Sequence, residues 1–147
     1  LSGMDVLDMG CGSGILSIAA LLLGAKSVSA ADIDQLAVKI AHENAALNGC
    51  DDERLTIRCG NVLDDPALAD EIGEKSYDVI VANIVADVIK AMAPLFARYL
   101  KEDGTLVVSG IISERAEEVT SHLEQHGFQV CELREEDDWA AAVLKRA

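Results

Sequence analysis

The chain has 147 residues, half of them apolar, which suits one domain with a core of its own. Its net charge of −14 argues against direct nucleic-acid binding, because Lys and Arg contacts to phosphates carry most of that affinity; the charge would suit a basic protein partner. No apolar run reaches the ~18 residues that span a bilayer, so we expect no membrane segment. The four cysteines form no Cys-x-x-Cys pair, which favours reduced thiols in a cytoplasmic protein without a metal site.

Apolar runs of strand length alternate with segments of helical period along the chain. Strands are predicted over Met4–Met9, Ser27–Asp32, Leu55–Cys59, Tyr77–Ala82 and Thr105–Ser109. Helices are predicted over Ile15–Leu23, Leu36–Leu47, a short stretch from about Pro66, Asp87–Leu100 and Glu114–His126, with Gly127 as the cap of the last. The tetrapeptide "KEDG" at Lys101–Gly104 predicts a turn into the fifth strand. This alternation is typical of parallel βα units.

The pattern changes after Gly127. Phe128–Leu133 and Trp139–Leu144 are strand-like, and only a short acidic loop separates them. A link that short cannot make a parallel crossover, so the two strands should pair as an antiparallel hairpin. The sequence therefore predicts one α/β domain over residues 1–147. Its doubly wound, seven-stranded sheet would be mostly parallel and close with a C-terminal antiparallel hairpin.

Residues 8–14, "DMGCGSG", would form the turn from the first strand into the first helix. Ligands of open parallel sheets bind beyond the carboxyl ends of the strands, and glycine lets a backbone take positive φ and approach a ligand closely. A dinucleotide fingerprint would need glycine where Ile15 stands. The stretch "GAKS" at Gly24–Ser27 is no phosphate loop, because it follows a helix and its lysine is displaced.

Polar side chains follow three further strands. Asp32 ends the second strand, where a carboxylate can accept both hydroxyls of a ribose, whereas Asp34 suits the N-cap of the next helix. Asn61 follows the third strand, where its amide could read an adenine edge. Asn83 follows the fourth strand, across from the glycine turn. Either asparagine could instead satisfy local backbone groups, as is common in turns.

Together these motifs resemble those of the class I S-adenosylmethionine-dependent methyltransferases. The resemblance covers nearly the whole chain and is carried by "DMGCGSG", "AADID", "GN" after the third strand and "ANI" after the fourth. Longer segments are similar to the family that methylates ribosomal protein L11 of the large subunit: "VLDMGCGSGILSIAALLLGAKSVSAADID", "VIVANIVADVI", "LVVSGII" and "DDWAAAVLKR". This resemblance implies S-adenosylmethionine as cofactor and methylation of lysine or N-terminal amino groups on a basic ribosomal protein.

The resemblance also implies a set of site residues. Asp8, Gly10, Gly12 and Gly14 would line the methionine part of the cofactor, Asp32 would hold the ribose and Asn61 the adenine, and Cys11 and Ile33 complete the cofactor-binding set. Asn83 would face both the cofactor and the incoming amine. We expect this catalytic residue to orient the amine without taking its proton. Asn61 stands where many relatives of the wider class carry aspartate.

Some features of the family are missing from the sequence. The family carries an N-terminal substrate-recognition domain and a glycine- and threonine-bearing cofactor segment, and this chain begins too late to contain either. We therefore expect a catalytic domain without its recognition domain.

Four other interpretations stay open. A methyltransferase of nucleic-acid bases often has prolines and an aromatic after the asparagine, which "NIVA" lacks. A small-molecule methyltransferase and a non-catalytic binding module are the next two, and Ile15 disfavours a nicotinamide-dependent oxidoreductase.

Overall fold

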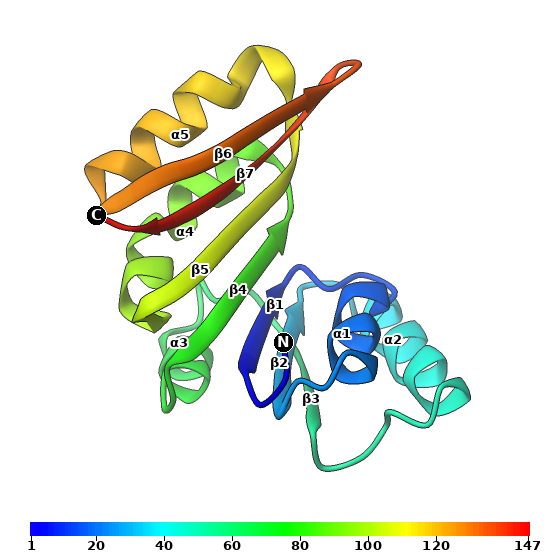
Figure 1. Cartoon of the computed structure of the whole chain (residues 1–147). Coiled ribbons are helices and arrows are strands. Elements are labelled where there is room, and N and C mark those ends of the chain that lie inside the picture. The colour runs from blue at the N-terminus through cyan, green and yellow to red at the C-terminus, as the bar shows by residue number, and fades with distance from the viewer.

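The computed structural model describes all residues 1–147 and builds one sheet from seven strands. These are β1 (Asp5–Met9), β2 (Ser27–Asp32), β3 (Leu55–Cys59), β4 (Tyr77–Asn83), β5 (Leu100–Ile112), β6 (Phe128–Glu136) and β7 (Trp139–Arg146). Their order across the sheet is β3-β2-β1-β4-β5-β7-β6 (Figure 1). The chain runs outward from β1 to β3, then returns to β4 on the other side of β1. This reversal places a switch point between β1 and β4.

The strand directions confirm the fold predicted from the sequence. The pairs β2–β3, β1–β2, β1–β4 and β4–β5 are parallel. The pairs β5–β7 and β6–β7 are antiparallel, so the last two strands form the expected hairpin. The sheet is thus doubly wound and mostly parallel, with a C-terminal antiparallel hairpin.

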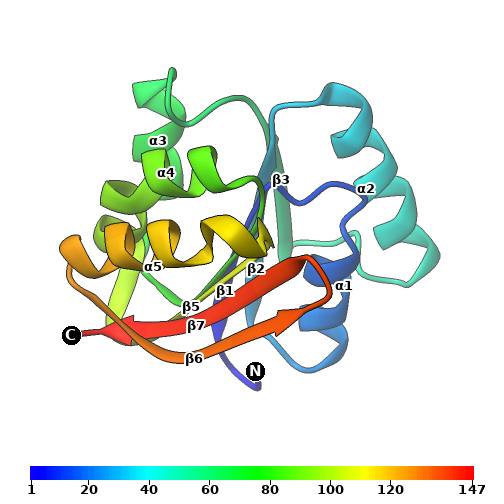
Figure 2. The ribbon, with the colours of Figure 1, turned by 90° about the horizontal axis from the view of Figure 1, so that it is seen from above.

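Five α-helices cover the two faces of the sheet. They are α1 (Ile15–Leu22), α2 (Gln35–Leu47), α3 (Pro66–Ile72), α4 (Ala86–Tyr99) and α5 (Ala116–Gln125), the last preceded by a 3-10 turn over Ser113–Arg115. Figure 2 shows α1 and α2 on one face and α3, α4 and α5 on the other. None of these helices combines the length and the apolar character needed to cross a membrane.

Local sequence signals set several helix ends. The Asp34 carboxylate accepts the Leu36 N–H at 2.9 Å and so caps α2, as predicted. Asp65 caps α3 in the same way by accepting the Leu68 N–H at 3.1 Å. Gly127 follows α5 with φ +92°, the left-handed conformation common just after helix ends.

The predicted turn at "KEDG" is wrong, because β5 already begins at Leu100. Leu100 is only 3% exposed and pairs with Tyr77 directly after α4 ends. The next pair joins Val79 to Thr105, so β5 advances five residues while β4 advances two. The four residues of the tetrapeptide are accommodated in this irregular stretch of strand. Burial of Leu100 outweighs the local turn preference of the polar residues that follow it.

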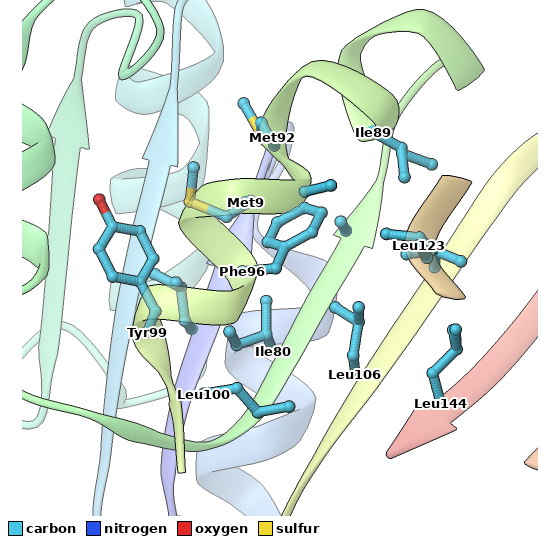
Figure 3. Close-up of a cluster of buried hydrophobic side chains, with 14 of the residues drawn as sticks. Met9, Ile80, Ile89, Met92, Phe96, Tyr99, Leu100, Leu106, Leu123 and Leu144 are labelled. Atoms are coloured by element: carbon cyan, nitrogen blue, oxygen red, sulfur yellow. The ribbon is translucent and has the colours of Figure 1, made fainter. Parts of the chain in front are cut away.

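The larger core lies between the sheet and helices α3 to α5 and contains 27 buried residues. Figure 3 shows Phe96 of α4 among Ile80 of β4 and Leu106 of β5, and all three are 0% exposed. Burying a side chain of this size stabilises a fold by roughly 1.5–3 kcal/mol. A second cluster of nine residues packs α1 and α2 on the opposite face. The core therefore fixes α4, whose first turn borders the edge of the sheet where the strands end.

Candidate functional site

A cavity of about 370 Å³ opens where β1, β2, β3 and β4 reach their carboxyl ends. Its polar side chains are Asp32, Asn61 and Asn83. Its apolar walls include Met9, Ile33, Val62, Ile84, Val88 and Met92. The volume falls within the roughly 300–1,000 Å³ typical of small-molecule sites. Apolar walls combined with a few polar groups are also typical of such sites. The cavity lies at the switch point, where the sequence places its binding motifs.

The glycines of the turn after β1 all have positive φ: +76° at Gly10, +53° at Gly12 and +84° at Gly14. Their surroundings differ. A Cβ at Gly14 would lie 3.0 Å from the Cβ of Ala41 in α2, so this glycine allows close packing of the helix. A Cβ at Gly12 would meet no atom within 4 Å. Gly12 therefore presents bare backbone to open space, which is what a closely approaching ligand requires.

Gly10 is required by a contact within the chain. A Cβ at this position would lie 2.3 Å from Cγ2 of Ile84, the residue directly after β4. Cγ2 is attached to the branched Cβ of isoleucine and has little freedom to move away. The turn after β1 thus packs against the turn after β4, and both border the cavity.

Asp32 connects the tip of β2 to the glycine turn. Its Oδ2 accepts the Gly12 N–H at 2.9 Å, and its Oδ1 accepts the Asp34 N–H at 2.9 Å. An ionised carboxylate offers about four lone-pair positions, so each oxygen can accept one more hydrogen bond. Asp32 is half-buried and lines the cavity, so these free positions are available to hydroxyl donors of a ligand.

Asp8 lies below the turn and is only 1% exposed. Its Oδ2 accepts the Ser17 hydroxyl at 2.7 Å, whereas its Oδ1 has no hydrogen-bond partner. Burial, and to a smaller extent the charge of Asp32, raises the pKa of the Asp8 carboxyl. Asp8 borders a smaller apolar cavity of about 200 Å³ beside α1 and is not part of the larger cavity wall. Its hydrogen bond with Ser17 joins the end of β1 to α1.

Cys11 also lies inside the fold. It is 8% exposed and packs with Ala30 and Ala41. Burial, with smaller contributions from Asp8 and Asp32, raises the pKa of the Cys11 thiol to about 12. This shift keeps the thiol protonated at neutral pH and so suppresses the nucleophilic thiolate.

The Asn61 carboxamide lines the cavity, but most of its hydrogen bonds are made within its own loop. Its Oδ1 accepts the Leu63 N–H at 3.0 Å, and its Nδ2 donates to Asp64 at 3.1 Å. This is the local turn role that asparagine often plays after a strand. One N–H of the carboxamide remains for a ligand.

Asn83 ends β4 on the opposite wall of the cavity and is exposed. It pairs with Ser109 across the β4–β5 ladder. Its Oδ1 lies only 2.5 Å from the position that a Cβ on Gly110 would occupy. The carboxamide thus occupies space that a side chain at position 110 would fill, and its hydrogen-bonding groups have no partner within the chain.

The structure brings Gly10, Asp32, Ile33, Asn61 and Asn83 together around the cavity, while Asp8, Cys11, Gly12 and Gly14 support or form the adjoining turn.

Sequence reasoning did not identify the apolar walls. Val88 and Met92 are four residues apart on α4 and share one helical face, and this spacing is a signal that could have found them. Ile84 directly follows Asn83, and Val62 directly follows Asn61, so each lies next to a residue that the sequence did indicate.

Comparisons with known proteins place the chain in a family. A family model described as ribosomal protein L11 methyltransferase (PrmA) matches residues 1–147. A ribosomal protein L11 methyltransferase from Acetivibrio thermocellus is 45% identical over 143 residues, which are 97% of this chain and 43% of the relative. The chain thus spans less than half the length of the curated relatives it matches.

Two solved structures show the same fold. Ribosomal protein L11 methylase from Lactobacillus delbrueckii subsp. bulgaricus superposes with a TM-score of 0.87 at 36% identity, over 99% of this chain and 71% of that chain. Magnesium protoporphyrin IX methyltransferase from Synechocystis PCC 6803, solved with bound S-adenosylmethionine, has a TM-score of 0.77 at 19% identity, over 99% of this chain and 71% of that chain. At 19% identity the second likeness concerns the fold alone.

Proposed function

The chain belongs to the ribosomal protein L11 methyltransferase family, and from this membership we propose that it transfers methyl groups from S-adenosylmethionine to amino groups of a large-subunit ribosomal protein. The acceptors would be lysine side chains, an N-terminal amine or both. The family match and the motifs at the switch point support this assignment. The reaction would take place in the cytoplasm, and the net charge of −14 suits a basic protein acceptor and opposes direct binding to nucleic acid.

The observation that carries the cofactor assignment is the unused hydrogen-bonding capacity of Asp32 at the cavity wall. Both of its oxygens already accept a backbone N–H, yet each keeps capacity for one more hydrogen bond, and the residue lines a space bounded by apolar side chains. Two adjacent hydroxyls of a ribose match this arrangement, and the apolar wall formed by Ile33 and Val62 suits a flat base. The open space beside the Gly12 backbone leaves room for the remainder of the cofactor.

S-adenosylmethionine supplies an electrophilic methyl group on a sulfonium centre. The chain has to bring a neutral amine in line with that group, and most of its contribution is therefore positioning. A free lysine has a pKa of about 10.4, and apolar walls such as Val88 and Met92 disfavour its charged form. Asn83, whose carboxamide oxygen and nitrogen are free, orients the amine at the cavity. No proton transfer to Asn83 is required.

Calorimetric titration of the chain with S-adenosylmethionine, with NADH in parallel, tests the cofactor assignment. We expect saturable binding of S-adenosylmethionine alone. Asp32→Ala should weaken it by roughly 10- to 100-fold, since hydrogen bonds to a charged group contribute about 1.5–3 kcal/mol. Asp34→Ala is the matched control, because Asp34 caps α2 and does not line the cavity. Binding of NADH alone would refute the assignment.

Transfer of a radiolabelled methyl group to purified ribosomal protein L11 tests the acceptor. Asn83→Ala should reduce turnover far more than cofactor affinity, since it removes the group that orients the amine. Equal turnover in Asn83→Ala and the unsubstituted chain would exclude that role. Cofactor binding without transfer to this protein would assign the methyl acceptor to another class of molecule.

A further inference from the structure

We propose that Gly110 is a positioning residue for Asn83: a bulge in β5 leaves room at Gly110 for the Asn83 carboxamide, and this room allows the carboxamide its position at the cavity. What Asn83 does there rests on the proposed function. The placement itself depends only on the fold and can be tested without any methyl transfer.

The bulge is visible in the pairing of β5 with β7. Val108 pairs with Ala142, and the next pair joins Ile111 to Ala140. β5 therefore advances three residues while β7 advances two, which leaves one extra residue in β5. Gly110 lies in this extra stretch with φ +76°. Glycine in the left-handed conformation is typical of a β-bulge, because other residues adopt it at an energetic cost.

The bulge lies directly against the end of β4. A Cβ on Gly110 would be 2.5 Å from Oδ1 of Asn83 and 3.6 Å from both the N and the O of Ile84. Real side chains essentially never approach a Cβ as closely as 2.5 Å. Any residue larger than glycine must displace the Asn83 carboxamide or push the β4–α4 turn away from β5.

Gly10 limits the movement of the β4–α4 turn away from β5, because it lies on the β1 side of that turn. β4 lies between β1 and β5 in the sheet, and Gly10 of the turn after β1 accommodates Ile84 as closely as Gly110 accommodates Asn83. The turn after β4 is therefore enclosed by two left-handed glycines from its two neighbouring strands. The Asn83 side chain is the part that can still rotate, so it is the carboxamide that has to move if Gly110 gains a methyl group.

An NMR experiment tests the placement directly. The chain has four asparagines, Asn44, Asn48, Asn61 and Asn83, so asparagine-selective ¹⁵N labelling gives four side-chain amide pairs. We expect Gly110→Ala to shift the Asn83 pair and leave the others in place. Gly127→Ala is the matched control, because Gly127 also has positive φ and a Cβ there would meet no atom within 4 Å. An unmoved Asn83 pair in Gly110→Ala overturns the proposal.

Kinetics separate positioning from general damage. Gly110→Ala should lower kcat on the order of 100-fold, since a displacement of about 1 Å can cost that much, with little change in cofactor affinity. In the Asn83→Ala background the same substitution should cost almost nothing further. A loss that is equal in both backgrounds contradicts action through Asn83.

The test still gives a result if the first variant does not fold or if the chain is inactive. If Gly110→Ala does not fold, Gly110→Asn replaces it, because asparagine tolerates positive φ and still introduces a Cβ. If the unsubstituted chain transfers no methyl group, the proposed function fails while the NMR result still decides the placement of Asn83.

Discussion

The backbone N–H of Gly12 donates to Oδ2 of Asp32 at 2.9 Å, a bond between residues twenty positions apart that joins the glycine turn to the tip of β2. Asp32 therefore shapes the turn before any ligand arrives. We predict that Asp32→Ala accelerates hydrogen exchange at the Gly12 amide by at least about tenfold, because a charge-assisted bond contributes roughly 1.5–3 kcal/mol. Amide exchange followed by NMR measures this, and unchanged protection would show that the turn forms without Asp32.

Substitution by alanine should affect mainly stability at Gly10 and mainly cofactor binding at Gly12. Both have positive φ, so both substitutions carry similar backbone strain. Only Gly10→Ala creates a collision, with Ile84, and we expect it to lower the free energy of unfolding by about 1–3 kcal/mol more than Gly12→Ala does. Gly12→Ala should instead weaken cofactor binding. Urea unfolding and calorimetry of the two variants provide the comparison.

A second substitution identifies the cause of the damage at Gly10. Ile84→Ala removes Cγ2, the atom that a Cβ at position 10 would approach to 2.3 Å. The double variant Gly10→Ala/Ile84→Ala should therefore lose less stability than the sum of the two single losses. Additive losses in urea unfolding would exclude this contact as the reason for glycine.

The pH dependence of stability should report on Asp8. Its pKa is raised above 3.8 in the folded chain, so the folded state binds more protons than the unfolded state just above that pH. Stability from this group is present at low pH and is lost as the pH rises through the folded pKa. Asp8→Asn removes that loss, so its stability relative to the unsubstituted chain should increase over the pH range that begins just above 3.8. If the difference in stability between the two chains stays constant across that range, burial does not shift the pKa of the Asp8 carboxyl.

The four free cysteines should fall into two groups that differ in how fast their thiols react. Cys59 and Cys131 are exposed, whereas Cys11 and Cys50 are buried. The pKa of about 12 at Cys11 further suppresses its thiolate. We expect an aromatic disulfide reagent to modify two thiols quickly in the native chain and all four after unfolding. Rapid reaction of Cys11 would show that the turn opens in solution.

Signals local in sequence were sufficient for much of the fold and part of the site. Asp34 caps α2 as its position before the apolar run predicts, and the short loop before Trp139 predicts the hairpin. Asp32 and Asn83 lie at the cavity because strand ends of a parallel sheet meet at one edge.

What the sequence did not reveal depends on contacts between distant residues. The need for glycine at Gly10 comes from Ile84, far along the chain, and no pattern within the turn indicates it. The burial of Asp8, which is 1% exposed and accepts the Ser17 hydroxyl, likewise depends on packing against α1. Leu100 starts β5 early because of its burial, against the turn preference of the residues after it.

The position of β7 has a consequence for how the protein is made. β7 is the last strand in the sequence, yet it lies between β5 and β6 in the sheet. During synthesis the N-terminal end of the chain emerges first, so β6 leaves the ribosome before β7, the one strand it pairs with, has been made. Until Trp139–Arg146 is added, β5 has an open edge and β6 has no sheet to join, and open edges invite pairing with other chains. A nascent chain stopped just before Trp139 should therefore aggregate, whereas eight more residues complete the sheet.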